Sequence, residues 1–390
     1  MKYDFDAVID RRETSSVKYD LRGRIFGKED VLPMWVADMD FAVPDFILDA
    51  IRKRLDHPVL GYTFRSDRFS DCVASWLKRR HAWKVETASI GFSPGIVPAL
   101  NMCVLEFSDP GDKVVVQPPV YFPFFSAISN HGRELVHNQL VKRDNYYEMD
   151  LDHLEELFAD GAKLFFLCNP HNPVGRAWSR DELQQLADLC VKYQVIVISD
   201  EIHSDLLLFG KRHIPFASLG KDIADLTLTC MAPSKTFNLA GLYTSVMIAT
   251  NSLLMKRYEK ILDAIHVGGD NILGQVALEA AYTSGDEWLD QLLVYLENSF
   301  KAFSSVVNTA VPEMLISPLE ATYLAWLDFS FLKLDNERLR EFIIHKAGLG
   351  LNDGPMFGPG GSQHQRLNLA TPKKILLEGA ERLVAAVQGA

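Results

Sequence analysis

The sequence predicts an α/β protein: a large domain around a mostly parallel, doubly wound sheet, plus a smaller α+β domain built from both chain ends. Three observations support this. Short β-branched runs alternate with amphipathic stretches, most of these runs are apolar throughout, and no repeat, low-complexity tract or long linker interrupts them. Uniformly apolar strands are typical of a sheet covered on both faces. The strand–helix–strand rhythm indicates parallel pairing.

The central region, residues 46–285, is expected to form the large domain. Its strands are expected at residues 88–93, 113–117, 134–140, 163–168, 195–199, 226–231 and 245–250. Between two of them, Ser179-Arg180-Asp181-Glu182 has the pattern of a capping box, in which the first and last side chains bond each other's backbone N–H. Apolar residues at helical spacing follow, so we expect a helix over 183–193.

The two chain ends have a different pattern. Residues 1–45 are expected to form an irregular N-terminal arm, and residues 286–390 the small domain. A long helical pattern follows residue 285, then strands at 313–318 and 323–329 and a helix near 337–347. The last helix is expected to begin at Thr371-Pro372, with Thr as the cap and Pro at the first helical position.

Composition and charge exclude several classes of protein. The 390 residues include 40 Lys and Arg against 51 Asp and Glu, a formal charge of −11, which argues against a nucleic-acid-binding surface. No apolar run reaches the ~20 residues of a membrane helix. The segment after Met1 is too polar for a signal peptide. We therefore expect a cytoplasmic protein with no nucleic-acid or membrane partner.

The cysteines indicate a reduced protein. They are odd in number and scattered, and several lie in apolar runs: Cys72, Cys103, Cys168, Cys190 and Cys230. This usage is typical of packed, reduced thiols. No C-x-x-C pair occurs, so no metal site is expected.

Three reactive residues follow expected strands, where ligands of open parallel sheets bind. Asp200 could pair there with a buried cation or simply cap the next segment. Lys235, if buried, would have a lowered pKa and could form an imine with an aldehyde, although most lysines are surface charges. Asn172 lies in an Asn-Pro-rich loop that either aims it inward or is a plain turn.

Together these segments resemble the fold-type-I pyridoxal-phosphate (PLP) enzymes. The loop Asn169-Pro170-His171-Asn172-Pro173-Val174-Gly175, then Asp200-Glu201-Ile202-His203, then Ser234-Lys235-Thr236-Phe237-Asn238 occur in that family's order, and 35 residues separate positions 200 and 235. More narrowly, the chain is similar to the MalY/PatB-type cystathionine β-lyase group, through residues 34–41, 61–62, 200–203 and 234–242.

The resemblance implies PLP as the cofactor and assigns roles around it. Lys235 would bind PLP covalently and then move the substrate Cα proton. Asp200 would keep the pyridine nitrogen protonated, which makes the ring an electron sink. Asn172 would donate to the phenolic oxygen, and Tyr121 would stack on the ring. His203 is either a further contact or a packed side chain.

The resemblance also implies a phosphate site where the strand 88–93 turns into a helix. Backbone N–H groups at a helix start bind anions without a basic side chain. The implied ligands are Ser93, the amides of Ile96 and Val97, the hydroxyl of Ser234 and, from the neighbouring subunit of a homodimer, Tyr62. Many family members have Arg or Lys eight residues after the PLP lysine, but here that residue is Tyr243.

On the substrate side, the resemblance implies that Arg366 holds the substrate α-carboxylate, since a guanidinium binds carboxylates bidentately. Trp35 and Tyr323 would lie over the mouth of the site. Two departures concern the substrate side chain: Ala321 stands where relatives usually have Gly, and His364 stands where Phe is expected.

The leading hypothesis for function is a PLP-dependent carbon–sulfur lyase. It would catalyse α,β-elimination of cystathionine or related S-substituted cysteines to pyruvate, ammonia and a thiol. The first alternative is an aminotransferase that uses the same residues on an amino acid and a 2-oxo acid. The second is a regulatory protein that uses the enzyme's surface to sequester a transcription factor. The sequence leaves the physiological substrate and leaving group open.

Overall fold

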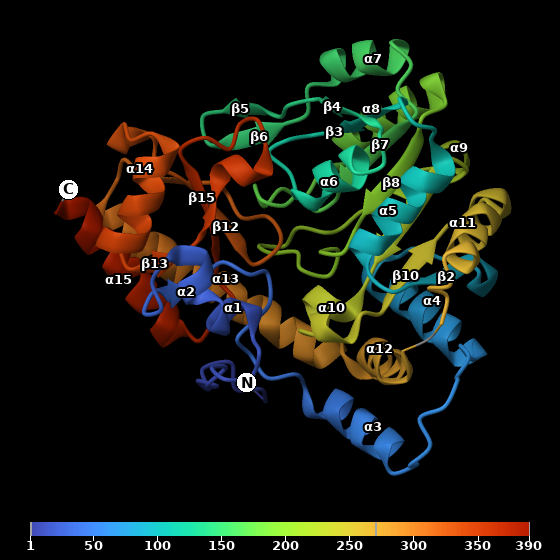
Figure 1. Cartoon of the computed structure of the whole chain (residues 1–390), viewed down its shortest axis with the longest axis horizontal. Helices are drawn as coiled ribbons and strands as arrows, with labels where there is room; N and C mark the ends of the chain where they lie inside the picture. Colours follow the sequence, from blue (N-terminus) through green and yellow to red (C-terminus); the bar gives the residue numbers. More distant parts are fainter. Residues whose placement is uncertain (1, 270, 390) are drawn as a thin grey trace.

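The computed structural model describes residues 2–269 and 271–389, and in this part of the chain a seven-stranded sheet forms the centre (Figure 1). The strand order is β2 (Ile90–Ser93), β10 (Ser245–Ile248), β9 (Thr227–Met231), β8 (Ile196–Asp200), β7 (Leu164–Cys168), β3 (Lys113–Val116) and β4 (Glu134–His137). Strand β10 is antiparallel to both neighbours, and the other pairs are parallel. Every strand expected in the central region is present, which confirms the predicted fold class.

The central strands bury both faces, as their uniform apolarity predicts. Phe166 and Ile198 belong to one hydrophobic core, together with helices α5 (Ile96–Phe107) and α11 (Ser252–Ala264). Phe165 and Val197, one residue away, belong to a second core with α7 (Leu151–Ala159) and α8 (Arg180–Tyr193). Successive side chains of a strand point to opposite faces, so two cores are the expected result. The capping box of α8 forms as predicted, between Ser179 and Glu182.

A second, antiparallel sheet lies beside the first. Its order is β11 (Leu315–Ile316), β12 (Leu324–Asp328), β15 (His364–Asn368) and β14 (Asn352–Asp353). The helices α13 (Asp286–Ala310) and α15 (Lys373–Gln388) pack against each other next to it (Figure 1). Helix α15 begins one residue later than expected, because Pro372 has extended backbone dihedrals and is the cap itself. The helix expected at 337–347 is α14 (Asn336–Glu341) followed by a wider π turn, Phe342–Lys346.

The N-terminal arm is more ordered than predicted. It contains α1 (Val17–Asp20), α2 (Arg22–Phe26) and β1 (Leu32–Pro33), which pairs in parallel with β13 (Leu349–Gly350). Buried ion pairs explain the order: Asp40 accepts from Lys18 at 2.8 Å and from Arg11 at 2.7 Å, and Arg11 also reaches Asp38 at 2.6 Å. Since unpaired buried charges are costly, this cluster fixes the path of the arm.

The remaining elements complete the covering layers. They are α3 (Asp45–Leu55), α4 (Asp67–His81), α6 (Pro123–Ser129), α9 (Lys221–Ala224), α10 (Pro233–Thr236), α12 (Ile272–Ser284), β5 (Val141–Arg143) and β6 (Tyr146–Glu148). The cysteines are unpaired and buried, as expected. Within the described ranges, no helix has the length and apolarity required to cross a bilayer. The domain boundaries at 45/46 and 285/286 stay a prediction.

Candidate active site

A cavity lies at the carboxyl ends of the parallel strands β7 and β8. Its lining residues are Ala37, Ile96, Tyr121, Cys168, Asn172, Asp200, Ile202, His203 and Lys235. Six of them are residues that the sequence singled out, and they come from five separate segments of the chain. The cavity therefore lies where a doubly wound sheet is expected to bind its ligand.

Asp200 is the last residue of β8 and is buried. Its Oδ1 accepts a hydrogen bond from the backbone N–H of Ile202 at 3.1 Å. Burial raises the pKa of Asp200 to about 7, because desolvation disfavours the carboxylate. A cation brought next to this carboxyl would be stabilised and would in turn keep Asp200 ionised.

Lys235 lies in the short helix α10, immediately after β9. Burial lowers its pKa to about 8, and the positive charge of Arg366 contributes to the shift. Its Nζ donates to the carbonyl of Ala37 at 2.7 Å. An amine with this pKa is partly uncharged near neutral pH, which is the form that attacks an aldehyde.

A buried carboxylate that sequence reasoning missed, Asp205, holds this lysine in place. Its side chain accepts from Thr236 at 2.8 Å, from Trp76 at 3.0 Å and from His81 at 3.0 Å. Thr236 follows Lys235, and Asp205 lies in the loop that follows Asp200. The network thus fixes the segments that carry Asp200 and Lys235 relative to each other. These contacts could not be predicted from spacing in the sequence.

The remaining cavity residues frame the space between Asp200 and Lys235. Burial raises the pKa of Tyr121 to about 12, so its ring is a neutral wall. His203 packs edge-on against Tyr323, and its buried Nδ1 has no hydrogen-bond partner. Burial also lowers the pKa of His203 far below its ordinary value. Asn172 accepts from Arg366 at 3.0 Å through Oδ1, which leaves its amide nitrogen to face a ligand.

The expected phosphate ligands are only partly assembled around this cavity. Helix α5 begins at Ile96, which lines the cavity, and Val97 follows it in the first turn. Ser93 bonds the carbonyl of Gly95 at 2.8 Å, and Ser93, Val97 and Ser234 are not themselves lining residues. The side chain of Tyr62 is fully exposed and does not line the cavity either.

Tyr243, at the position where the resemblance predicts a basic residue, is largely exposed. It lines a second cavity, of about 590 Å³, together with Lys235, Arg11 and Asp38. Tyr243 therefore brings no positive charge to the first cavity, and the anion site expected there stays the start of α5.

Arg366 belongs to β15 and reaches the site from the second sheet. Its guanidinium donates to Asn352 at 2.6 Å and to the carbonyl of Trp35 at 3.2 Å, and it lies 4.9 Å from the ring of Phe357. Its buried Nε has no partner, and burial lowers the pKa of Arg366 to about 10. A desolvated guanidinium with an unused donor is suited to an incoming carboxylate.

The Trp35 ring was expected to lie over the mouth of the site, but in the structure it points into the arm. The ring packs against Phe26, and its Nε1 donates to the carbonyl of Lys18 at 3.0 Å. Only its carbonyl contacts Arg366. The short helices of the arm, not anticipated from sequence, create this apolar pocket for the indole. Tyr323 is buried and donates to the carbonyl of Ala37 at 2.9 Å.

Two asparagines that the sequence analysis missed, Asn368 and Asn352, bond the residues around Arg366. Asn368 donates to the carbonyls of Val36 at 2.7 Å and Asp38 at 2.6 Å and so binds the arm to β15. It lies two residues after Arg366, on the same face of a strand, which is a signal that could have found it. Asn352 is paired with Arg366 in register across β14 and β15, which no local pattern reveals.

These residues fit pyridoxal phosphate. Lys235 offers an amine for its aldehyde, Asp200 a buried acid for its ring nitrogen, and the start of α5 an anion site for its phosphate. The unpartnered Nε of Arg366 and Nδ1 of His203 are buried donors or acceptors that the protein alone leaves unused. Groups of this kind are rare unless a ligand engages them.

The sheet topology and this set of residues are those of a fold-type-I PLP-dependent enzyme. The model of the aminotransferase class I and II family matches residues 29–383, and the chain belongs to this family. It is 45% identical to cystathionine β-lyase PatB of Bacillus subtilis strain 168, over 98% of this chain and all of that protein. The crystal structure of cystalysin from Treponema denticola, which contains pyridoxal 5′-phosphate, superposes with a TM-score of 0.96 at 39% identity, covering both chains completely.

A second solved structure points the same way. The PLP-bound C–S lyase from Staphylococcus hominis has a TM-score of 0.91 and 35% identity, with 98% of each chain covered. The resemblance to the cystathionine β-lyase group, inferred from short motifs, is thereby confirmed over the whole chain.

Proposed function

We propose that this chain is a PLP-dependent carbon–sulfur lyase that cleaves cystathionine or related S-substituted cysteines into pyruvate, ammonia and a thiol. The observation that carries the proposal is the proximity of two buried groups. Lys235 lines the cavity, Arg366 donates to Asn172 of the same cavity, and the charge of Arg366 helps to lower the pKa of Lys235 to about 8, while the Nε of Arg366 is unused. Full-length similarity to a cystathionine β-lyase and to a C–S lyase supports the reaction type.

In this proposal each residue has a distinct task. Arg366 binds the α-carboxylate and so places the substrate Cα near Lys235. The Lys235 amine takes the Cα proton, and bound PLP supplies an electron sink for the charge that develops there. The Cβ–S bond then breaks, and the sulfur leaves as a thiolate. The remaining aminoacrylate reacts with water and gives pyruvate and ammonia.

The protein's other groups hold these participants in position. Asp200 would keep the ring nitrogen of the bound cofactor cationic, Tyr121 would stack on the ring, and Asn172 would donate its amide to the ring substituent. Ser93, the amides of Ile96 and Val97, and Ser234 would hold the phosphate, and of these Ile96 lines the cavity. The bonds from Lys235 and Tyr323 to the carbonyl of Ala37 close the wall toward the arm.

Pyruvate release tests this function. The PLP-loaded protein should form pyruvate from cystathionine with no added 2-oxo acid, in a one-to-one ratio with thiol. An aminotransferase instead needs a second 2-oxo acid for each turnover and releases no thiol. Formation of a new amino acid only when a 2-oxo acid is supplied, with no thiol released, would contradict the lyase proposal.

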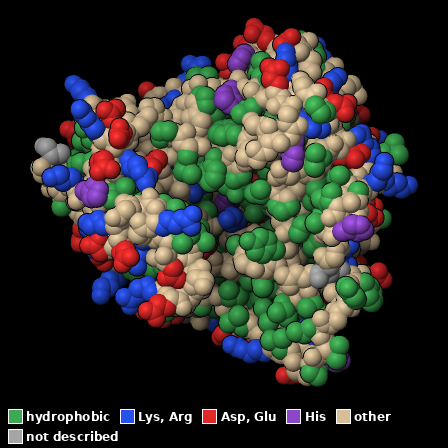
Figure 2. Space-filling view, viewed as in Figure 1, with side chains coloured by type: hydrophobic (Ala, Val, Ile, Leu, Met, Phe, Trp, Pro, Cys, Tyr) green, Lys and Arg blue, Asp and Glu red, His purple; other side chains and the backbone are tan. Residues whose placement is uncertain are grey.

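We also propose that the protein is a cytoplasmic homodimer in which Tyr62 completes the partner's phosphate site. The support is an exposed apolar segment between α3 and α4: Val59, Leu60, Tyr62 and Phe64 are 62%, 59%, 112% and 78% exposed. Hydrophobic side chains gather over this lower part of the molecule in Figure 2. Contiguous apolar surface of this kind usually marks an interface.

Sedimentation and subunit mixing test the dimer. The parent should sediment as a dimer, and Phe64→Asp should shift it toward monomer. Co-refolding two weakened variants, Tyr62→Ala and Lys235→Ala, should restore about a quarter of parental activity, because half of the dimers carry one intact site. No recovery in mixed dimers would place Tyr62 outside the partner's site.

A further inference from the structure

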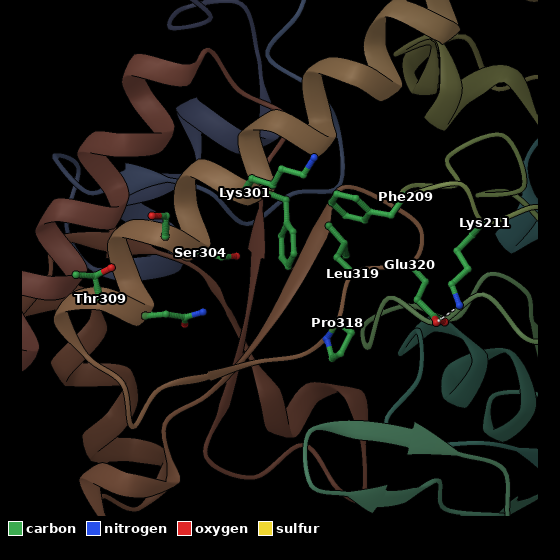
Figure 3. A pocket seen from close by; sticks show the side chains of 11 residues that line it. Phe209, Lys211, Lys301, Ser304, Thr309, Pro318, Leu319 and Glu320 are labelled. Atoms are coloured by element: carbon green, nitrogen blue, oxygen red, sulfur yellow. Dashed lines mark ion pairs between the residues drawn. The ribbon is translucent and has the colours of Figure 1, made fainter.

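A cavity of about 700 Å³ lies away from the candidate active site, between helix α13, the loop 207–211 and the segment 317–320 (Figure 3). It shares no lining residue with the PLP cavity. Its size falls within the range of small-molecule sites, about 300 to 1,000 Å³. The cavity is therefore large enough for a ligand that the proposed reaction does not use.

The walls of this cavity are aromatic and aliphatic. The rings of Phe209 and Phe300 lie 5.9 Å apart, centroid to centroid, and Leu319 and Pro318 belong to the same lining. Figure 3 shows Phe209 and Leu319 facing the helix that carries Lys301 and Ser304. Phe209 is 39% exposed, so its ring stays accessible to a ligand in the cavity.

The backbone holds the Phe209 ring at the cavity under strain. Phe209 has a φ of 53°, in the left-handed region that side chains other than Asn, Asp and Gly rarely adopt. Its N–H donates to the Glu297 carboxylate of α13 at 2.7 Å, which fastens the loop to the helix. A strained residue that keeps an apolar ring partly in solvent is a feature to be explained by binding rather than by stability.

The charged groups of the cavity leave one positive charge without an acidic partner among the described residues. Lys301 lies 5.4 Å from the Phe209 ring centroid and has no carboxylate partner within residues 2–269 and 271–389. Glu320, the only acid lining the cavity in those ranges, is already paired with Lys211 at 2.6 Å and with Arg176 at 2.9 Å. The shielded hydroxyl of Ser304 has no hydrogen-bond partner. One free cation and one unused hydroxyl thus border an aromatic surface.

We infer that this cavity binds a small aromatic carboxylate. The ring would lie against Phe209 and Phe300, and the carboxylate would lie within reach of Lys301. Aromatic faces prefer stacked or edge-on rings, and an ammonium at the rim adds charge complementarity. The proposal is independent of the lyase function, because none of these residues belongs to the PLP site.

The test uses two probes of the same shape: 2-naphthoate and its neutral amide, 2-naphthamide. Ligand-detected NMR titration of the PLP-loaded protein should give a Kd for naphthoate of about 0.1 to 1 mM, the range for ligands of this size. The amide should bind about three- to fivefold more weakly, the value of one partly exposed charge pair. Lys301→Gln should remove this difference and leave the binding of the amide unchanged.

A second variant tests the aromatic wall. Phe209→Asn removes the ring while keeping a residue that tolerates the left-handed backbone, so it should fold normally and weaken both probes about tenfold. Lys84→Gln, an exposed lysine elsewhere, is the matched control and should change nothing. Equal affinity for both probes in the parent, or naphthoate binding unaffected by Lys301→Gln and Phe209→Asn, would overturn the proposal.

Discussion

The floor and the wall of the candidate site are built in different ways. The floor is formed by Asn172, Asp200 and Lys235, which follow the neighbouring parallel strands β7, β8 and β9. The wall is formed by Arg366, Asn352 and the arm, and the bond from Arg366 to Trp35 joins residues 331 positions apart. Neighbouring strands of one sheet, together with the Asp205 network, position the floor, whereas the wall depends on contacts between the two chain ends.

This difference has a functional consequence. Residues fixed by the register of one sheet cannot shift independently, which suits groups whose relative geometry determines a reaction. Within the wall, β15 is held to the arm largely by side chains that donate to backbone carbonyls, such as Asn368 to Val36 and Asp38. Changes in the floor should therefore alter turnover, and changes in the wall should alter KM for the substrate.

The largest effect is expected for Lys235→Ala in the floor. Pyruvate release should fall about 10³-fold or more, because this variant loses both the covalent attachment of the cofactor and the proton acceptor. Mass spectrometry after borohydride reduction should detect PLP bound covalently to the parent only. Lys84→Ala, on the surface, should behave like the parent. PLP still attached to the Lys235→Ala chain would mean that another lysine carries the cofactor.

A smaller effect is expected for Arg366→Lys in the wall. The variant keeps the positive charge but loses the guanidinium group that can bind a carboxylate through two N–H groups. KM for cystathionine should therefore rise about 10- to 100-fold, while kcat changes about threefold at most. Steady-state kinetics separates the two parameters. Arg338→Lys is the control, because the Arg338 side chain is 78% exposed. A fall in kcat with an unchanged KM would erase the distinction between floor and wall.

The same contrast explains what the sequence could predict. The uniformly apolar strands and the residues that follow them, Asp200 and Lys235, are local patterns, so the sheet and much of its floor could be derived. Asn352 lies opposite Arg366 only through pairing of β14 with β15. The path of the arm, including the unexpected position of the Trp35 ring, depends on buried ion pairs between distant charges. Such tertiary contacts leave no periodic signal in the sequence.

The pH dependence of PLP capture tests whether Lys235, in the floor, has the lowered pKa. Burial and Arg366 lower the pKa of Lys235 from 10.5 to about 8, and only the uncharged amine attacks the aldehyde. The rate of PLP capture by apoprotein should rise about tenfold per pH unit below pH 8 and level off above it. Stopped-flow absorbance measures this profile. A rate that keeps rising to pH 10 would show an ordinary, solvated lysine.

The smallest effect is expected for Asn368→Ala, which removes two of the hydrogen bonds between β15 and the arm without touching the floor. The carbonyls of Val36 and Asp38 lose one donor each, and Ala37 between them is less firmly placed. KM should rise about fivefold, consistent with the loss of one or two neutral hydrogen bonds. The absorbance of bound PLP and its capture profile should match the parent, because Lys235 and Asp200 stay where the sheet holds them. Leu367→Val, one residue away and facing the core, is the control for stability alone. If Asn368→Ala instead shifts the capture profile, the arm takes part in setting the pKa of Lys235, and the two regions are coupled through the carbonyl of Ala37.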